Sequence, residues 1–189
     1  NRQSLIYGMG DQHLDIVVSK LKERYKVDVE LSKPKVPFRE TLRKNSDVEG
    51  KHKKQSGGHG QYGHVKMRFE PSGDLETPYV FEQVVVGGAV PKNYFPAVEK
   101  GIQECCAKGP LAGYPVVGIK ATLLDGSYHP VDSSEMAFKM AATLAFKKGF
   151  MDANPVLLEP IASVKVVVPD KFTGCLLYTS PSPRDGLLS

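Results

Sequence analysis

The spacing of the apolar residues changes along this chain, and that change limits the fold more than any other feature of the sequence. Apolar side chains from Leu14 to Tyr25 recur at helical spacing, whereas residues 27–31 alternate apolar and charged, as in a half-buried strand. A short apolar stretch over residues 5–7 precedes them. The opening of the chain is therefore predicted to run strand, helix, strand.

Similar changes of period continue through the rest of the chain. Alternation predicts two strands around a glycine-rich loop, while Asp132 and Glu135 resemble the capping box that begins a helix. Asp125 followed by Gly126 predicts the end of a strand. The mixture predicts an α+β fold and not a doubly wound sheet, with strands near 48–54, 65–69, 79–86 and 117–124 and helices near 98–105 and 133–149.

Charge and cysteine content narrow the class of protein. The 189 residues carry a formal charge of +4 and are 41% hydrophobic, which suits one ordinary core or two small ones and permits a polyanionic partner. Cys105, Cys106 and Cys175 form neither a disulfide framework nor a CxxC metal site, so a reducing cytoplasm is expected. No apolar run approaches the roughly 20 residues that span a bilayer, so no membrane partner is expected.

The first candidate site is the glycine-rich segment 57–63. Its GxGxxG spacing matches a dinucleotide fingerprint and a kinase glycine loop, but the next residues alternate like a strand, and the other kinase elements are missing. Small side chains allow close approach to the backbone of a ligand such as a nucleic acid, and Tyr62 or the histidines can stack on bases. Positive charge behind the loop comes from Lys51, Lys53 and Lys54. The alternative is a solvated, charged hairpin without a ligand.

The second candidate is the loop 126–132, which places His129 between a strand end and a helix start. A hydrolase reading would pair Ser133 or Ser134 with His129 and Asp132, but residues this close in sequence rarely form a triad. A zinc reading would use His52, His59, His64 and His129, without cysteine partners or HExxH spacing. No catalytic and no metal residue is therefore predicted.

The end of the chain differs from the rest. Residues 175–189 lose all periodicity and resemble the translation of an adapter used in sequencing libraries. We interpret this segment as an artefact that is not native and give it no functional weight.

Five segments resemble, in order, parts of bacterial elongation factor G, a family of translational GTPases. The resemblance extends over residues 1–174 and rests on residues 8–15 (GMGDQHLD), 54–63 (KQSGGHGQYG), 109–117 (GPLAGYPVV), 126–129 (GSYH) and 131–135 (VDSSE). Five ordered matches make the resemblance specific.

The resemblance implies an architecture and a set of site residues. Residues 1–43 are expected to form the C-terminal half of domain III, half of a ferredoxin-like domain, and 158–174 the start of domain V. Residues 44–157 are expected to form domain IV, with a fold like domain 2 of ribosomal protein S5 and a tip that enters the decoding centre. The RNA-binding tip residues implied are Gly57, Gly58, His59, Gly60, Gln61, Tyr62, Gly63 and His129, with Lys51, Lys53 and Lys54 as basic support.

The function implied is GTP-dependent translocation of tRNA and mRNA on the ribosome, with this chain as a fragment that supplies the arm. GTP and Mg²⁺ are expected in an upstream domain of the parent protein, and no enzyme activity or cofactor is expected in the fragment. The expected partners are the small-subunit decoding centre, tRNA, mRNA and rRNA. The fragment is expected to be monomeric and cytoplasmic.

Two positions depart from the family pattern, which usually has arginine at residue 59 and aspartate at residue 130. His59 weakens phosphate attraction, and Pro130 stiffens the chain and removes a backbone donor. A diverged paralogue, a ribosomal protection protein and a stand-alone S5-like RNA-binding module without a GTPase stay open as alternatives. Translocation and ribosome recycling are not separated, because both use the same arm.

Overall fold

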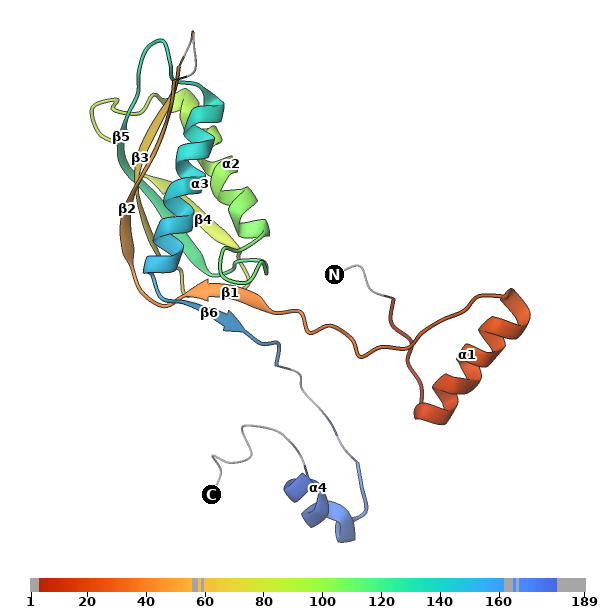
Figure 1. Cartoon of the computed structure of the whole chain (residues 1–189). Helices are drawn as coiled ribbons and strands as arrows, with labels where there is room; N and C mark the ends of the chain where they lie inside the picture. The colour runs from red at the N-terminus through yellow and green to blue at the C-terminus, as the bar shows by residue number, and fades with distance from the viewer. Residues whose placement is uncertain (1–3, 56–57, 59, 162–164, 166, 180–189) are drawn as a thin grey trace.

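The computed structural model describes residues 4–55, 58, 60–161, 165 and 167–179. Its body is a four-stranded sheet in the order β2-β3-β5-β4, with two helices on one face (Figure 1). The β2–β3 and β3–β5 pairs are antiparallel, and β4 runs parallel to β5. The body consists of β2 (Ser46–Lys54), β3 (Gln61–Pro71), β4 (Tyr79–Gln83), η1 (Lys92–Tyr94), α2 (Phe95–Ala107), β5 (Ile119–Ser127) and α3 (Glu135–Asp152). The predicted α+β class is confirmed.

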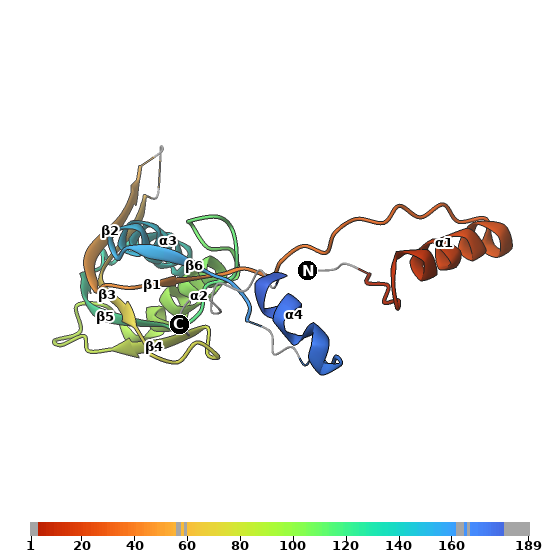
Figure 2. The same ribbon diagram turned by 90° about the horizontal axis from the view of Figure 1, so that it is seen from below.

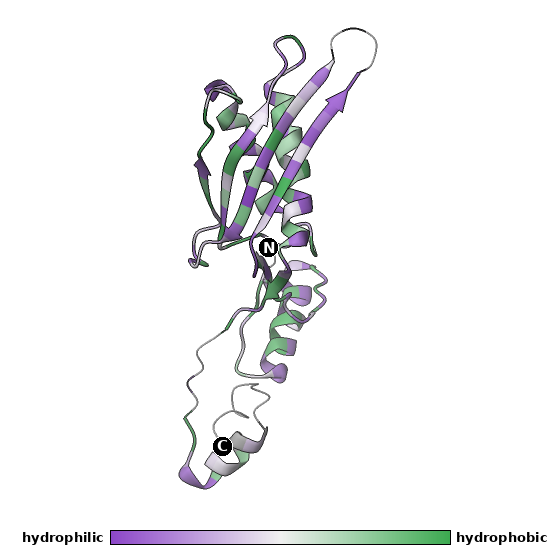
Figure 3. Ribbon diagram, turned by 90° about the vertical axis from the view of Figure 1, so that its left-hand side faces the viewer, coloured by the Kyte–Doolittle hydropathy of each residue, from purple (hydrophilic) through white to green (hydrophobic). Residues whose placement is uncertain are grey.

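The core lies between the sheet and the two helices. Val65, Met67 and Phe69 of β3 are fully buried, as their alternation predicted, and the intervening residues are more exposed. The same alternation is visible as changing colour along the strands in Figure 3. The Phe69 ring meets that of Phe146 in α3 edge to face, with centroids 5.4 Å apart. Each such buried side chain contributes about 1.5–3 kcal/mol, so this face fixes the sheet on α3.

A two-stranded sheet, here called the stalk, lies at the base of the body. It consists of β1 (Arg39–Leu42) and β6 (Pro155–Leu158), which pair antiparallel although they are far apart in sequence (Figure 1). Glu40 of β1 is completely buried. Its carboxylate accepts hydrogen bonds from the backbone N–H groups of Leu111, Ala112 and Tyr114 at 3.0, 2.8 and 2.9 Å. The stalk is thereby fastened to the loop that follows α2.

The helix predicted near the start of the chain is present as α1 (Asp11–Tyr25), but the strands predicted on either side of it are wrong. Residues 5–7 and 27–31 adopt no strand structure. Neither segment pairs with another strand among the described residues, so an extended backbone there would lack hydrogen-bond partners. α1 buries none of its residues and lies apart from the body (Figures 1 and 2).

Two local predictions within the body are also wrong. β5 does not end at Asp125 and Gly126, because both residues pair with β3 and the strand continues to Ser127. Cross-strand hydrogen bonding therefore outweighs the local turn preference. α3 is capped by Ser134, whose Oγ accepts from the backbone nitrogen of Ala137 at 3.2 Å. Asp132 is consequently not the cap of this helix.

The tail forms a short helix, α4 (Thr173–Thr179), preceded by η2 (Asp170–Phe172). Figure 1 shows α4 away from the body, and α4 contains the first residues of the segment interpreted as an adapter artefact. That interpretation stays a prediction, as do the domain boundaries after residues 43, 157 and 174.

Candidate nucleic-acid interface

Two loops reach the same end of the body, at the top of Figure 1. They are the β2–β3 connection, of which residues 55, 58 and 60 are described, and the β5–α3 connection, residues 128–134. The backbone nitrogen of Tyr62 donates to the carbonyl oxygen of Asp132 at 2.8 Å, and that of Gly60 to Asp132 Oδ1 at 3.0 Å. These loops, here called the tip, therefore form one surface.

Ser133 ties the two loops together a second time. Its Oγ donates to the carbonyl oxygen of Tyr62 at 2.8 Å and accepts from the backbone nitrogen of His129 at 2.8 Å. Sequence reasoning missed this role, because it considered Asp132 as a helix cap and Ser133 as a hydrolase serine. The sequence does contain one indication of this role. Asp132 and Ser133 are adjacent polar residues between His129 and a helix start, where polar side chains often form hydrogen bonds with the nearby backbone.

The His129 ring is held from one side. Its Nδ1 accepts from the backbone nitrogens of Val131 at 3.3 Å and Asp132 at 3.2 Å. A ring nitrogen that accepts carries no proton, so in the neutral ring the proton lies on Nε2. The side chain is 54% exposed, and its Nδ1 also lies 3.6 Å from Asp132 Oδ2. Nε2 makes no hydrogen bond or ion pair to the described residues. His129 therefore offers an oriented N–H donor to a ligand.

Gln61 and Tyr62 lie where β3 leaves the first loop. Gln61 Oε1 is 2.9 Å from His52 Nε2. The Tyr62 hydroxyl is 2.8 Å from Ser127 Oγ, and Lys51 Nζ lies over its ring, 5.8 Å from the centroid. The Tyr62 ring is therefore anchored at both its hydroxyl and its face, which fixes its orientation at the tip.

The predicted glycines have different places. Gly57 and His59 lie outside the described residues. Gly58 has a backbone φ of +116°, which residues other than glycine rarely adopt. Gly63 lies inside β3, where an added Cβ would overlap the carbonyl oxygen of Ala137 in α3. Gly63 therefore serves the contact between sheet and helix and lies behind the surface of the tip.

Charge is distributed unevenly along the outer face of the sheet. Toward the stalk, cations face carboxylates, and hydrogen bonding from Arg68 lowers the pKa of Asp47. The base of this face is therefore close to neutral. The pairs are Arg68 with Asp47 at 2.6 Å, Lys120 with Glu82 at 2.9 Å and Glu70 at 3.6 Å, and Lys66 with Asp125 at 3.7 Å.

The tip end of β2 carries positive charge, which no ion pair neutralises within the described part of the chain. Lys51, Lys53 and Lys54 have no carboxylate within ion-pair distance among the described residues, and this end of β2 is hydrophilic in Figure 3. A hollow of about 210 Å³ separates the two loops, lined by Lys53, Lys54, Gln55, Gly60, Gln61, Tyr62, His129 and Asp132. Unpaired cations around a hollow suit a phosphate backbone.

Other chemistries lack support at the tip. The first loop is followed by a strand, so the helix that a dinucleotide site requires is not there. Ser133 Oγ bonds to backbone groups and not to an imidazole, unlike a hydrolase nucleophile. Within the described ranges, no three histidine, cysteine, aspartate or glutamate side chains are grouped as metal ligands. None of the described helices has the length and hydropathy that a membrane crossing requires.

Two family models match consecutive parts of the chain. They assign the α+β body with its two-loop tip to the class of translation-factor domains. The model for elongation factor G, domain IV, matches residues 34–154, and the model for elongation factor G, domain III, matches residues 1–33. The chain belongs to the elongation factor G family. The domain IV match includes the whole body and β1 of the stalk.

Individual relatives agree with this assignment. The chain is 54% identical over 182 residues to elongation factor G of Fervidobacterium nodosum, covering 96% of this chain and 26% of that protein. It is 54% identical over 172 residues to elongation factor G of Mycoplasma genitalium, covering 91% and 25%. A crystal structure of a Thermus thermophilus protein matches with a TM-score of 0.70 and 51% identity, covering 80% and 22%. The chain thus spans about a quarter of the length of its curated relatives.

Proposed function

We propose that this chain is the arm of a translation elongation factor that moves tRNA and mRNA through the ribosome. The arm enters the decoding site of the small subunit and contacts tRNA, mRNA and rRNA. GTP and Mg²⁺ are bound by another part of the parent protein, and the described part of the chain performs no chemistry itself. The factor acts as a monomer in the cytoplasm. Family membership and the geometry of the tip support this proposal.

The observation that carries the proposal is the charge difference between the base of the sheet and the tip end of β2. Ion pairs neutralise the base, whereas Lys51, Lys53 and Lys54 have no carboxylate within ion-pair distance among the described residues. Lys53 and Lys54 also line the hollow between the joined loops. Phosphate attraction is therefore concentrated at the tip. Occupation of the vacated site by the tip biases thermal movement of the RNAs forward, because the reverse movement is blocked.

The proline in the second loop is compatible with this role. Four backbone N–H groups of the loop have acceptors, those of His129, Val131, Asp132 and Ser133. Pro130 is the one position from 129 to 133 that has no N–H to satisfy. The proline thus stiffens the loop without leaving a backbone donor unpaired, and His129 keeps its orientation.

Single-turnover translocation by the restored full-length factor tests the proposal. His129→Ala removes the Nε2 donor, and a lost hydrogen bond of about 1 kcal/mol predicts a rate about fivefold lower. His13→Ala in α1 is the control, because it removes a histidine far from the tip, and it is expected to keep the rate. An unchanged rate in His129→Ala would count against the proposed role.

A further inference from the structure

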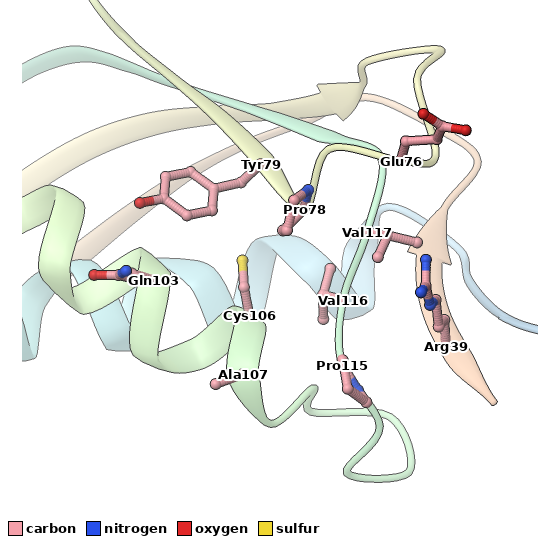
Figure 4. A pocket seen from close by; sticks show the side chains of 10 residues that line it. All are labelled: Arg39, Glu76, Pro78, Tyr79, Gln103, Cys106, Ala107, Pro115, Val116 and Val117. Carbon is pink, nitrogen blue, oxygen red and sulfur yellow. The ribbon is translucent and has the colours of Figure 1, made fainter. Parts of the chain in front are cut away.

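A second hollow lies at the base of the body, where β1 of the stalk meets α2 and β4 (Figure 4). Its volume of about 390 Å³ falls within the range of about 300–1,000 Å³ typical of small-molecule sites. It lies at the opposite end of the sheet from the tip, since Tyr79 and Val117 adjoin the ends of β4 and β5 that are distant from Ser127. The proposed RNA contacts therefore do not use it.

The walls of this base pocket are apolar. Cys106, Val116 and Val117 are almost fully buried, with 4%, 1% and 4% exposure, and Pro78, Ala107 and Pro115 extend the same surface. The backbone nitrogens of Val116 and Val117 already donate to the carbonyl oxygens of Cys106 and Glu40. The wall formed by these two valines therefore provides no backbone donor, which favours a hydrocarbon body in a ligand.

Cys106 belongs to this apolar wall. Burial raises the pKa of its thiol to about 12, so the sulfur is uncharged near neutral pH. A neutral buried thiol behaves as a small hydrophobic group and not as a nucleophile. The wall therefore offers packing without covalent chemistry.

One end of the pocket carries the Arg39 guanidinium and the Glu76 carboxylate, which do not form an ion pair with each other. The Arg39 guanidinium is exposed and has no carboxylate within ion-pair distance among the described residues. Figure 4 shows it beside Val117, with Glu76 on the neighbouring loop. A guanidinium with free N–H groups matches a carboxylate, which accepts two parallel hydrogen bonds.

We propose that the base pocket binds a small apolar carboxylic acid, with its hydrocarbon part against Cys106, Val116 and Ala107 and its carboxylate on Arg39. Gln103 lies at the other end and can hydrogen-bond to a polar substituent (Figure 4). The site joins the stalk to the body, because Arg39 belongs to β1 and the remaining wall to the body. This inference does not depend on the proposed function of the tip.

An isosteric pair of probes tests the site on the whole chain. Titration of the ¹⁵N-labelled protein with 1-naphthylacetate and with neutral 1-naphthylacetamide, followed by amide chemical shifts, gives both Kd values and the location. The acetate is expected to bind about three- to fivefold more tightly, because an ion pair with an exposed guanidinium contributes about 1 kcal/mol or less. The largest shifts are expected at Ala107, Val116 and Val117.

Two variants and one control separate charge from shape. Arg39→Met is expected to bring the Kd values of acetate and amide within about twofold of each other, whereas Arg43→Met, on an exposed arginine outside the pocket, keeps the preference. Ala107→Phe fills the pocket from α2 and is expected to abolish binding of both probes. Equal affinity for the two probes, shifts located elsewhere, no binding, or an unchanged preference in Arg39→Met would each overturn the proposal.

Discussion

Glu40 shows how a single residue fixes the relation between the stalk and the body. Its carboxylate is fully buried and accepts three backbone hydrogen bonds, while its own backbone nitrogen and oxygen bond to Pro115 and Val117 at 2.9 Å each. A side chain at Gly109 would overlap this carboxylate, so a glycine is needed there. A buried charge is tolerated only when its hydrogen bonds are made, and here the loop backbone makes them.

Glu40→Gln is expected to destabilise the body by about 1–3 kcal/mol. The carboxamide NH₂ would face a backbone N–H, which leaves buried donors without acceptors. Urea unfolding followed by circular dichroism measures this loss. Glu159→Gln, on an exposed glutamate next to the stalk, is the control and should change stability little. Equal stability of the two variants would contradict the role given to Glu40.

The cysteines give a second prediction at this scale. Burial raises the pKa of Cys105 and raises that of Cys106 to about 12, while Cys175 is exposed. Since the thiolate is the reacting form, a raised pKa slows alkylation at pH 8 and the rate increases only as the pH rises. Iodoacetamide with mass spectrometry should modify Cys175 first and the other two after denaturation. Rapid modification of Cys106 in the folded chain would contradict the packing described.

At the scale of elements, the close approach of β3 and α3 depends on the absence of a side chain at Gly63. A Cβ at this position would overlap the carbonyl oxygen of Ala137, and both belong to backbone that cannot move without separating sheet and helix. The sequence pattern placed Gly63 with the loop glycines. Its packing role became visible only when the register of β3 against α3 was known.

Gly63→Ala is therefore expected to destabilise the body by about 1–3 kcal/mol through overpacking. Gly10→Ala is a matched control, because no atom lies near an added Cβ at Gly10. Thermal unfolding of the two variants compares them directly. A Gly63→Ala chain as stable as the Gly10→Ala chain would show that the sheet and α3 are further apart than described.

Strands could be predicted correctly from the sequence where the core or the partner strand that stabilises them is present in this chain. The strands of the body were predicted because their alternating residues, such as Val65 and Phe69, fill a core present in this chain. The strand over 27–31 had the same alternation but no partner among the described residues, so the pattern misled. Asp132 was wrongly predicted to cap the helix. Its side chain instead accepts a hydrogen bond from Gly60, which is 72 residues away in the sequence, and such a contact leaves no local pattern.

At the scale of the whole molecule, the chain has a tip and a stalk at opposite ends of one body (Figure 1). Two candidate loops could be predicted from residue types alone, but their hydrogen-bonded contact through Asp132 and Ser133 is a tertiary feature. The same holds for the charge pattern, because the pairing of Arg68 with Asp47 depends on strand register. The roles of the tip residues in RNA binding stay a prediction.

The most direct test of this account measures how salt weakens binding of the chain to bacterial small ribosomal subunits carrying mRNA and tRNA. Each lysine on phosphate contributes about 0.7–0.9 to the slope of log K against log salt. A triple variant with glutamine in place of Lys51, Lys53 and Lys54 should therefore have a slope that is smaller in magnitude by about two units. The control is a triple variant with glutamine in place of three exposed lysines outside the tip, Lys20, Lys108 and Lys148. This control should leave the slope unchanged. Equal slopes in the two triple variants would contradict an RNA contact through the tip.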